Sequence, residues 1–355
     1  MANIDIILPY KELFRSNGAS AVSISVKNSI KYSKNKKNIT VYGQYVEKSF
    51  SDINFVGIKA KKFLHFGNNR SLIKQYLRKI GMQFSNRIIE IHNRPYLFNS
   101  LLNNKNNKCV ILYFHNDPLS MRGSKTKNER LNILRKASGI VFVSKFLRDK
   151  FLIGIDDVYN NTYVIPNSLD INKNVSIEKK LKHILFVGRI VKEKGVDLYI
   201  NAIKELSKKF VDWKFLLIGS SRLGYNNKTL YEKEIIRMVD NLGKNVEHHG
   251  YISNEKVKDF MSKGSILVIP SIWEEPFGMI AIEGLSNKMT VISSAVGGLT
   301  EIVKQKGILI KDINPKKLED KLEYLLRNPE EIKKYQNLAW YNYSFNQKEI
   351  SILQD

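Results

Sequence analysis

The sequence is poor in cysteine and contains no long apolar run. One cysteine, Cys109, in 355 residues excludes an internal disulfide and is typical of a reducing compartment. No run approaches the ~18 apolar residues that a membrane span needs, and no charged segment precedes the apolar N-terminus as in a signal peptide. Gly/Ser linkers, low-complexity tracts and internal repeats are also absent. These absences predict a cytoplasmic protein, either free or peripheral on the inner face of the cytoplasmic membrane.

Acidic residues are scarce in the first half of the chain. The formal net charge is +24, and residues 1–175 carry 29 Lys and Arg against 11 Asp and Glu, while residues 176–355 carry 29 against 23. Such a field attracts nucleic acid, anionic lipid or an acidic substrate without selecting one of them. The alternative is a Lys-rich proteome with ordinary solvated faces. Because no basic-aromatic motif or recognition-helix signature is present, we expect no nucleic-acid partner.

The hydrophobic pattern predicts two α/β domains. A chain of this length is too long for one core, and 43% of its residues are hydrophobic. Short β-type runs alternate with amphipathic stretches, which indicates right-handed βαβ units and parallel sheets. The pattern restarts after a polar, Lys-rich segment, so we expect Rossmann-like, doubly wound domains at 1–172 and 173–334, facing each other across a cleft. The predicted strands are 4–8, 87–91, 110–114, 139–143, 162–166, 183–187, 213–219, 265–270 and 289–293.

Ligands of such sheets bind beyond the carboxyl ends of the strands, where polar residues occur in both halves. In the first half, two strands run into IHNRP (91–95) and FHNDP (114–118), so His92 and His115 each stand at a strand end. Such a histidine contacts a ligand or acts as acid or base, or else it is merely held in a proline-led turn. Chelating spacing is missing, which disfavours a metal site. A small-residue turn around Gly18 offers a weak phosphate-loop signal, since GxGxxG is absent.

In the second half, GRIVKEKGVD (188–197) and SIWEEPFGMIAIEGL (271–285) each follow a predicted strand. Arg189 and Lys194 suit a diphosphate, unless the loop is only a solvated turn. Pro276 is expected at the first position of a helix whose free amides start at Phe277. An unbroken helix separates Glu275 from Glu283 by about 12 Å. That spacing disfavours a glycosidase pair, which needs about 5–9.5 Å, and approaches the length of a sugar-diphosphate-ribose; alternatively, the second glutamate faces water.

Three motifs in order, GRIVKEKGVD, EEPFGMIAIEG (274–284) and VGGLTEIV (296–303), resemble the retaining GT-B glycosyltransferases of family 4. IHNRP followed by FHNDPLSMRG is similar to a bacterial subset associated with lipopolysaccharide or envelope glycans. The resemblance implies transfer of a hexose-type sugar from a nucleotide-diphosphate-sugar to a hydroxyl of a glycan or lipid-linked acceptor, with retention. Alternatives are a GT-B epimerase or phosphorylase, or an inactive scaffold. No cofactor and no essential metal are implied, and residues 335–355 are expected to pack back on the first domain.

The resemblance also implies roles for single residues. Glu283 would hold the ribose, Glu275 the donor sugar, and His115 the transferred sugar, while Arg189 and Lys194 would stabilise charge on the leaving diphosphate. The family's Gly-Gly-Ala loop reads Asn17-Gly18-Ala19 here, which makes the phosphate contact of Gly18 a departure from the pattern. The remaining donor-site candidates are Gly219, Tyr251, Ile252, Phe277, Gly278, Met279 and Ile280, and the candidates for acceptor or sugar contacts are His92, Asn93, Asn116 and Asp117.

Overall fold

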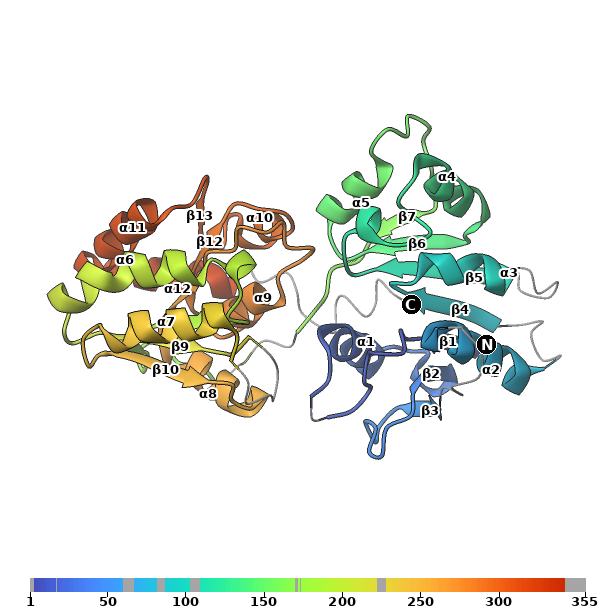
Figure 1. Ribbon diagram of the computed structural model, residues 1–355, viewed down its shortest axis with the longest axis horizontal. Helices are drawn as coiled ribbons and strands as arrows, with labels where there is room; N and C mark the ends of the chain where they lie inside the picture. The colour runs from blue at the N-terminus through green and yellow to red at the C-terminus, as the bar shows by residue number, and fades with distance from the viewer. Residues whose placement is uncertain are drawn as a thin grey trace. The chain divides into compact units, whose positions relative to one another are not determined.

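The computed structural model describes residues 3–16, 18–59, 67–81, 87–102, 109–169, 172, 174–221 and 228–341. The chain divides into two compact units, with the division between Ser168 and Leu169. Each unit is built on a single β-sheet whose strand pairs are all parallel (Figure 1). The predicted pair of parallel-sheet α/β domains is therefore confirmed.

The first domain has a seven-stranded sheet with the order β3-β2-β1-β4-β5-β6-β7. Its strands are β1 (Asn3–Ile7), β2 (Ile39–Gln44), β3 (Asn54–Ile58), β4 (Arg87–His92), β5 (Cys109–Phe114), β6 (Gly139–Phe142) and β7 (Thr162–Val164). Its described helices are α1 (Ala21–Lys31), α2 (Asn68–Ile80), α3 (Phe98–Leu102), α4 (Lys127–Lys136) and α5 (Lys145–Leu152), with short 3₁₀ turns at Lys36–Asn38, Pro95–Leu97 and Pro118–Ser120.

The second domain has a six-stranded sheet with the order β10-β9-β8-β11-β12-β13. Its strands are β8 (Leu181–Val187), β9 (Lys214–Ile218), β10 (Val246–Gly250), β11 (Gly264–Ile269), β12 (Thr290–Ser294) and β13 (Ile308–Ile310). Its described helices are η5 (Lys192–Lys194, a 3₁₀ turn), α6 (Val196–Lys209), α7 (Leu230–Asp240), α8 (Asn254–Lys263), α9 (Met279–Ser286), α10 (Leu299–Val303), α11 (Pro315–Arg327) and α12 (Pro329–Tyr341).

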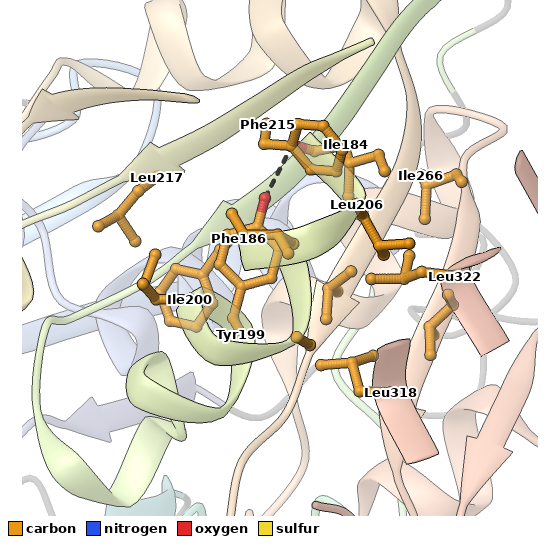
Figure 2. Close-up of a cluster of buried hydrophobic side chains, with 14 of the residues drawn as sticks. Ile184, Phe186, Tyr199, Ile200, Leu206, Phe215, Leu217, Ile266, Leu318 and Leu322 are labelled. Carbon is orange, nitrogen blue, oxygen red and sulfur yellow. Dashed lines mark hydrogen bonds between the residues drawn. The ribbon is translucent and has the colours of Figure 1, made fainter. Parts of the chain in front are cut away.

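Strand β8 shows why the core strands read as unbroken apolar runs. Ile184 and Phe186 point to one face of the sheet and Leu185 to the other, and all three are buried. A parallel sheet covered on both faces needs apolar residues at every position, not at alternate ones. On one face, β8 packs with helices α6 and α11 around Tyr199, whose hydroxyl donates to the carbonyl of Ile184 over 3.2 Å (Figure 2). The buried phenol thus gains a partner inside the cluster.

Helix α12 bears on the expected return of residues 335–355 to the first domain. Its N-terminal half packs on the second domain, where the hydroxyl of Thr290 donates to the carbonyl of Ile332 over 2.8 Å. The side-chain amide of Gln336 donates to the carbonyl of Ser265 over 3.4 Å. The part of the predicted segment up to Tyr341 therefore belongs to a helix of the second domain, and residues 342–355 lie outside the described residues. Among the helices described, none has the length and apolar character needed to cross a membrane.

Candidate functional site

The candidate residues gather where each sheet reverses its winding. In the first sheet the strand order reverses between β1 and β4, and in the second sheet between β8 and β11. Ligands of open α/β sheets bind outside the carboxyl ends of the strands at such a reversal. His92 is the last residue of β4, Arg189 and Lys194 follow β8, and Glu275 follows β11. The fold therefore places these predicted residues at the positions where a ligand is expected.

An ion pair joins the loop after β8 to the loop after β11. The ammonium of Lys194 donates to Oε1 of Glu275, and the hydroxyl of Ser271 donates to the same oxygen over 2.7 Å. Glu275 is only 8% exposed. Within the described residues, no hydrogen bond reaches its second oxygen, Oε2. The carboxylate is thus held by one oxygen and leaves the other for a ligand hydroxyl.

This ion pair depends on a close approach between two stretches of backbone. Gly195 has a φ of 64°, and a Cβ on this residue would lie 2.0 Å from the carbonyl oxygen of Pro270. The amides of Ile272 and Trp273 both donate to the carbonyl of Glu193, over 3.0 and 3.3 Å. Only a glycine allows the start of α6 to lie this close to the loop after β11.

Arg189 differs from Lys194 because it has no partner among the described residues. Its side chain is exposed, and its guanidinium makes no hydrogen bond or ion pair with any of them. A guanidinium presents five donors in a planar fork that matches phosphate oxygens. Arg189 is therefore an uncommitted cation at this edge of the sheet.

The helix after Glu275 begins later than the sequence predicts. We expected Pro276 as the first helical residue, but α9 begins at Met279 and Gly278 is its N-cap. The prediction was wrong because Gly278 has a φ of 113°, which a helix does not contain. The amide of Gly298 donates to the carbonyl of Glu275 over 2.7 Å and holds the preceding segment as a loop.

The later start changes two details of the predicted donor site. Phe277 is buried and lies before the helix, whereas the amides of Gly278, Met279 and Ile280 make no hydrogen bond with a described residue. Those three N–H groups lie at the positive end of α9. The spacing of about 12 Å for Glu275 and Glu283 assumed an unbroken helix, and it loses its basis because only the last part of that interval is helical.

Glu283 lies in α9 with a carboxyl group that has no partner among the described residues. Burial raises the pKa of this carboxyl to about 7 from an ordinary 4.5, and the charge of Lys258 opposes the rise. No described residue hydrogen-bonds the carboxylate. Glu283 is half-buried, which distinguishes it from a fully exposed surface glutamate.

Two close backbone contacts shape the region predicted to hold the base. The amide of Gly219 donates to the carbonyl of Gly250 over 2.8 Å. Gly219 also has a φ of 141°, and a Cβ on it would lie 1.8 Å from the carbonyl oxygen of Gly188. Beside this turn, Tyr251 is 46% exposed and Ile252 is half-buried. The turn is fixed by backbone contacts while an aromatic ring beside it stays accessible.

In the first domain, the structure brings His92 and His115 into contact. Nδ1 of His92 lies 2.8 Å from Nε2 of His115, and both rings are buried. Burial lowers the pKa of His92 to about 3 and the pKa of His115 well below its ordinary value, so both rings are neutral at pH 7. Between two neutral rings, one nitrogen donates and the other accepts. Asn93 supports the pair, because its Oδ1 accepts from the amide of His115 over 2.7 Å.

The other candidates of the first domain differ in whether their side chains are already engaged by other residues. Asp117 is committed to the fold, since its carboxylate pairs with Lys150 over 2.9 Å. Asn116 is exposed, and its side chain makes no hydrogen bond with a described residue. Gly18 is exposed with a φ of 70° just before α1, and Asn17 lies outside the described residues.

Three residues of this arrangement were assigned no role from the sequence. Ser271 fixes Glu275, Gly298 holds the loop before α9, and Glu90 lies 3.6 Å from His92. The spacing of Glu90 and His92 was a usable signal, because residues two apart on a strand share one face. Among the described residues, no group of three His, Cys, Asp or Glu side chains has the geometry to hold a metal ion.

Comparison with known proteins identifies similar families and folds. Residues 168–344 match the family model described as glycosyl transferases group 1. An uncharacterized glycosyltransferase of Methanocaldococcus jannaschii is 32% identical over 321 residues, which are 87% of this chain and 85% of the relative. The Anabaena protein HepE, solved with UDP and glucose, superposes with a TM-score of 0.77 at 16% identity over 100% of this chain and 98% of its own. WaaG, a glycosyltransferase involved in lipopolysaccharide biosynthesis, superposes with a TM-score of 0.69 at 12% identity, over 99% of this chain and 98% of its own.

We predict that Gly219→Ala destabilises the second domain far more than Gly250→Ala. Both glycines have positive φ, so each alanine carries a backbone strain of about 1–2 kcal/mol. Only at Gly219 does the new methyl group also collide with a carbonyl oxygen, whereas at Gly250 nothing lies within 4 Å. We expect a loss of about 3 kcal/mol or more at Gly219 in urea unfolding. Equal losses in the two variants would show that the backbone contact at Gly188 is not as close as described.

Proposed function

The chain belongs to the group 1 glycosyl transferases, and from this membership we propose that it transfers a hexose from a nucleotide-diphosphate-sugar to a hydroxyl acceptor with retention of configuration. The observation that carries this proposal is the arrangement around Glu275. Its carboxylate is fixed by Lys194 and Ser271 through one oxygen, and the other oxygen remains open among the described residues. A pre-organised acceptor of this kind suits a sugar hydroxyl, because no further ordering is needed on binding.

We assign donor binding to the second domain, where the unpaired groups match the parts of a nucleotide-sugar. The carboxyl of Glu283 suits the two ribose hydroxyls, and the accessible ring of Tyr251 suits the base. Arg189 and Lys194 supply positive charge for the diphosphate, and the free amides at the start of α9 add donors. These groups stabilise the charge that develops on the leaving diphosphate. In this proposal the charge is neutralised by the chain itself, without an essential metal ion or cofactor.

We assign the transferred sugar and the acceptor to the first domain. His115 is proposed to contact the sugar, and Asn93 and Asn116 are candidates for hydroxyl contacts. Asp117 is a weaker candidate because Lys150 already engages it. A phosphorylated or lipid-linked glycan of the cell envelope suits the basic first half of the chain, and WaaG, a glycosyltransferase involved in lipopolysaccharide biosynthesis, shares the fold. The alternative of an epimerase or phosphorylase predicts turnover of the donor without an acceptor.

The first test of the proposal is nucleotide-sugar binding and its dependence on pH. UDP-, GDP- and ADP-glucose are screened by thermal shift, and a donor at 100 times its Kd adds about 2.7 kcal/mol to the free energy of unfolding. Ribose hydroxyls that donate to the Glu283 carboxylate favour its charged form and lower its pKa. Because the pKa in the free protein is about 7, binding releases a proton below that pH. We expect binding about tenfold weaker at pH 6 than at pH 8.

The matched variants are Glu283→Gln and Glu234→Gln. The amide that replaces the Glu283 carboxyl cannot ionise, so the affinity should fall by about 10-fold or more through the lost charged hydrogen bonds, and its pH dependence should disappear. Glu234 is an exposed glutamate of α7 in the same domain, and its replacement should change neither property. If Glu283→Gln keeps the wild-type affinity and pH profile, Glu283 does not bind the ribose.

Retention of configuration is tested on the product. With the α-linked donor found in the screen and a simple hydroxyl acceptor, we expect an α-glycoside, which proton NMR identifies from its anomeric coupling constant. The spectrum is recorded during the first turnovers, before any slower equilibration. A β-glycoside as first product would exclude the retaining assignment but leave the transferase assignment intact.

Peripheral membrane binding is tested by flotation on vesicles. The excess of cationic side chains in residues 1–175 predicts flotation with anionic vesicles and not with zwitterionic ones, since each Lys or Arg near an anionic surface contributes about 1 kcal/mol. The interaction should weaken between about 0.1 and 1 M salt, where the screening length shortens from about 10 to 3 Å. Equal flotation with both vesicle types would contradict an electrostatic membrane contact.

A further inference from the structure

Glu90, His92 and His115 form a line of polar groups along one face of the first sheet. Glu90 and His92 are two residues apart on β4, so their side chains share a face. Nδ1 of His92 lies 2.8 Å from Nε2 of His115, and the other nitrogen of His92, Nε2, lies 3.6 Å from Oε2 of Glu90. The second distance is a few tenths of an ångström longer than a hydrogen bond. A hydrogen bond between the two atoms requires the Glu90 side chain to move by those few tenths of an ångström.

The surroundings of this line are mostly apolar: the two histidines are buried and Glu90 is half-buried. The register partners of Glu90 are Ile6 on β1 and Ile111 on β5. Tyr113, on β5, stacks on His92 with ring centroids 4.6 Å apart and an interplanar angle of 8°. Burial and the charge of Glu90 raise the pKa of Tyr113 well above its ordinary value, so its hydroxyl stays protonated. The groups that can exchange a proton along the line are therefore the carboxyl and the two imidazoles.

One buried atom in the line lacks a partner. Among the described residues, Nε2 of His92 is buried without a hydrogen bond, although burying an unpaired polar nitrogen costs about 1–3 kcal/mol. The nearest polar group on its own strand is the Glu90 carboxyl. A proton between these two atoms gives Nε2 of His92 a hydrogen bond. Whether the proton is bound to Glu90 or to His92 determines the tautomers of His92 and His115.

Consider first the ionised carboxylate of Glu90. It only accepts, so the proton lies on Nε2 of His92, and Nδ1 of the neutral ring becomes an acceptor. His115 must then donate from Nε2 across the 2.8 Å contact. Its remaining nitrogen, Nδ1, carries a lone pair and acts as a hydrogen-bond acceptor.

The protonated carboxyl of Glu90 reverses each of these bonds. Its O–H donates to Nε2 of His92, whose proton moves to Nδ1 and is donated to Nε2 of His115. The proton of His115 then lies on Nδ1, which becomes a donor. The two states differ by one proton: when Nδ1 of His115 releases it, the His92 proton shifts to Nε2 of His115 and the Glu90 proton shifts to His92. Both rings remain neutral throughout.

We propose that Glu90 and His92 are positioning residues that decide whether Nδ1 of His115 presents a proton or a lone pair to a substrate hydroxyl. The inference rests on the proposed function, in which His115 contacts the transferred sugar. Within the described residues no hydrogen bond reaches Nδ1 of His115, and the residue keeps 8% of its surface exposed. A ligand hydroxyl can both donate and accept, so the state of the line selects the orientation in which it binds.

The switch falls in the physiological range. Burial raises the pKa of Glu90 to about 7, so the donor form of His115 Nδ1 prevails below pH 7 and the acceptor form above it. The rings do not add a titration of their own there, because burial lowers the pKa of His92 to about 3 and that of His115 well below its ordinary value.

Histidine tautomers are read directly from nitrogen NMR. Full-length protein labelled with ¹⁵N-histidine is followed between pH 5.5 and 8.5 by long-range proton–nitrogen correlation, with His92→Asn and His115→Asn used only for assignment. We expect both rings to exchange their protonated and bare nitrogens together, with one midpoint near pH 7. A ring that becomes doubly protonated in this range, or two rings without a common transition, would overturn the proposal.

The matched variants are Glu90→Gln and Glu47→Gln. The amide that replaces the Glu90 carboxyl cannot ionise, so the tautomers should stay constant with pH. Replacement of Glu47, an exposed glutamate of the same domain, should leave the transition unchanged. The wild-type titration decides the proposal even where Glu90→Gln fails to fold. A transition that persists in folded Glu90→Gln would assign the proton to another group and overturn the inference.

Turnover of the donor separates this inference from the proposed function. One outcome is that the tautomers exchange in the spectra but Glu90→Gln leaves the pH profile of kcat/KM unchanged. It would support proton exchange along Glu90, His92 and His115 and would contradict a contact of His115 with the sugar. If the tautomers do not exchange, the inference about Glu90, His92 and His115 is wrong, whatever the pH profile of turnover. The titration of Glu283 adds no histidine signal to the spectra, and its effect on kcat/KM is common to the wild type and Glu90→Gln.

Discussion

The contact between Gly195 and the carbonyl of Pro270 determines the rest of the second domain's candidate site. It joins the loops after the two central strands, β8 and β11, at backbone distance, so the residue before the glycine, Lys194, reaches Glu275. Glu275 is fixed in turn by Ser271, and its carbonyl receives the amide of Gly298, which sets where α9 begins. A side chain at Gly195 would separate the loops and, with them, every group that follows.

The carboxyl groups of the candidate sites fall into two kinds, and the difference is chemical. Glu275 is buried but receives a cation and a hydroxyl, which offset the loss of water around its charge. Glu283 and Glu90 are half-buried without such donors among the described residues, and the pKa of each rises to about 7. The first kind is held in place by its two donors. The second kind changes charge over the neutral range, and perturbed groups of this type gather at functional sites more often than elsewhere.

Much of the fold was predictable because covered parallel strands are continuous apolar runs. All nine predicted strands are present, whereas β2, β3, β10 and β13 were missed. The strand β10, VEHHG, is an edge strand rich in polar residues, and β13 has three residues, so neither has a long apolar run. The start of α9 was misplaced because the prediction used only the preference of proline for the first helical position. The positive φ of Gly278, which delays the helix, follows from packing. Spacing on β4 puts Glu90 on the face of His92, but the contact of Ser271 with Glu275 lies in a loop, where sequence spacing does not give the distance.

An unpaired carboxyl that is partly removed from water is costly to the folded protein, and protonation near neutral pH limits that cost. A ligand that brings hydroxyl donors to Glu283 restores its charge, so ligand binding and proton release become one event. At Glu90 the donor is already present as His92, but it is placed a few tenths of an ångström too far away for a hydrogen bond. Burial disfavours the imidazolium that an ion pair requires, so once that gap closes the carboxyl and the neutral rings carry one exchangeable proton. The same desolvation thus prepares Glu283 for a ligand and makes His115 responsive to Glu90.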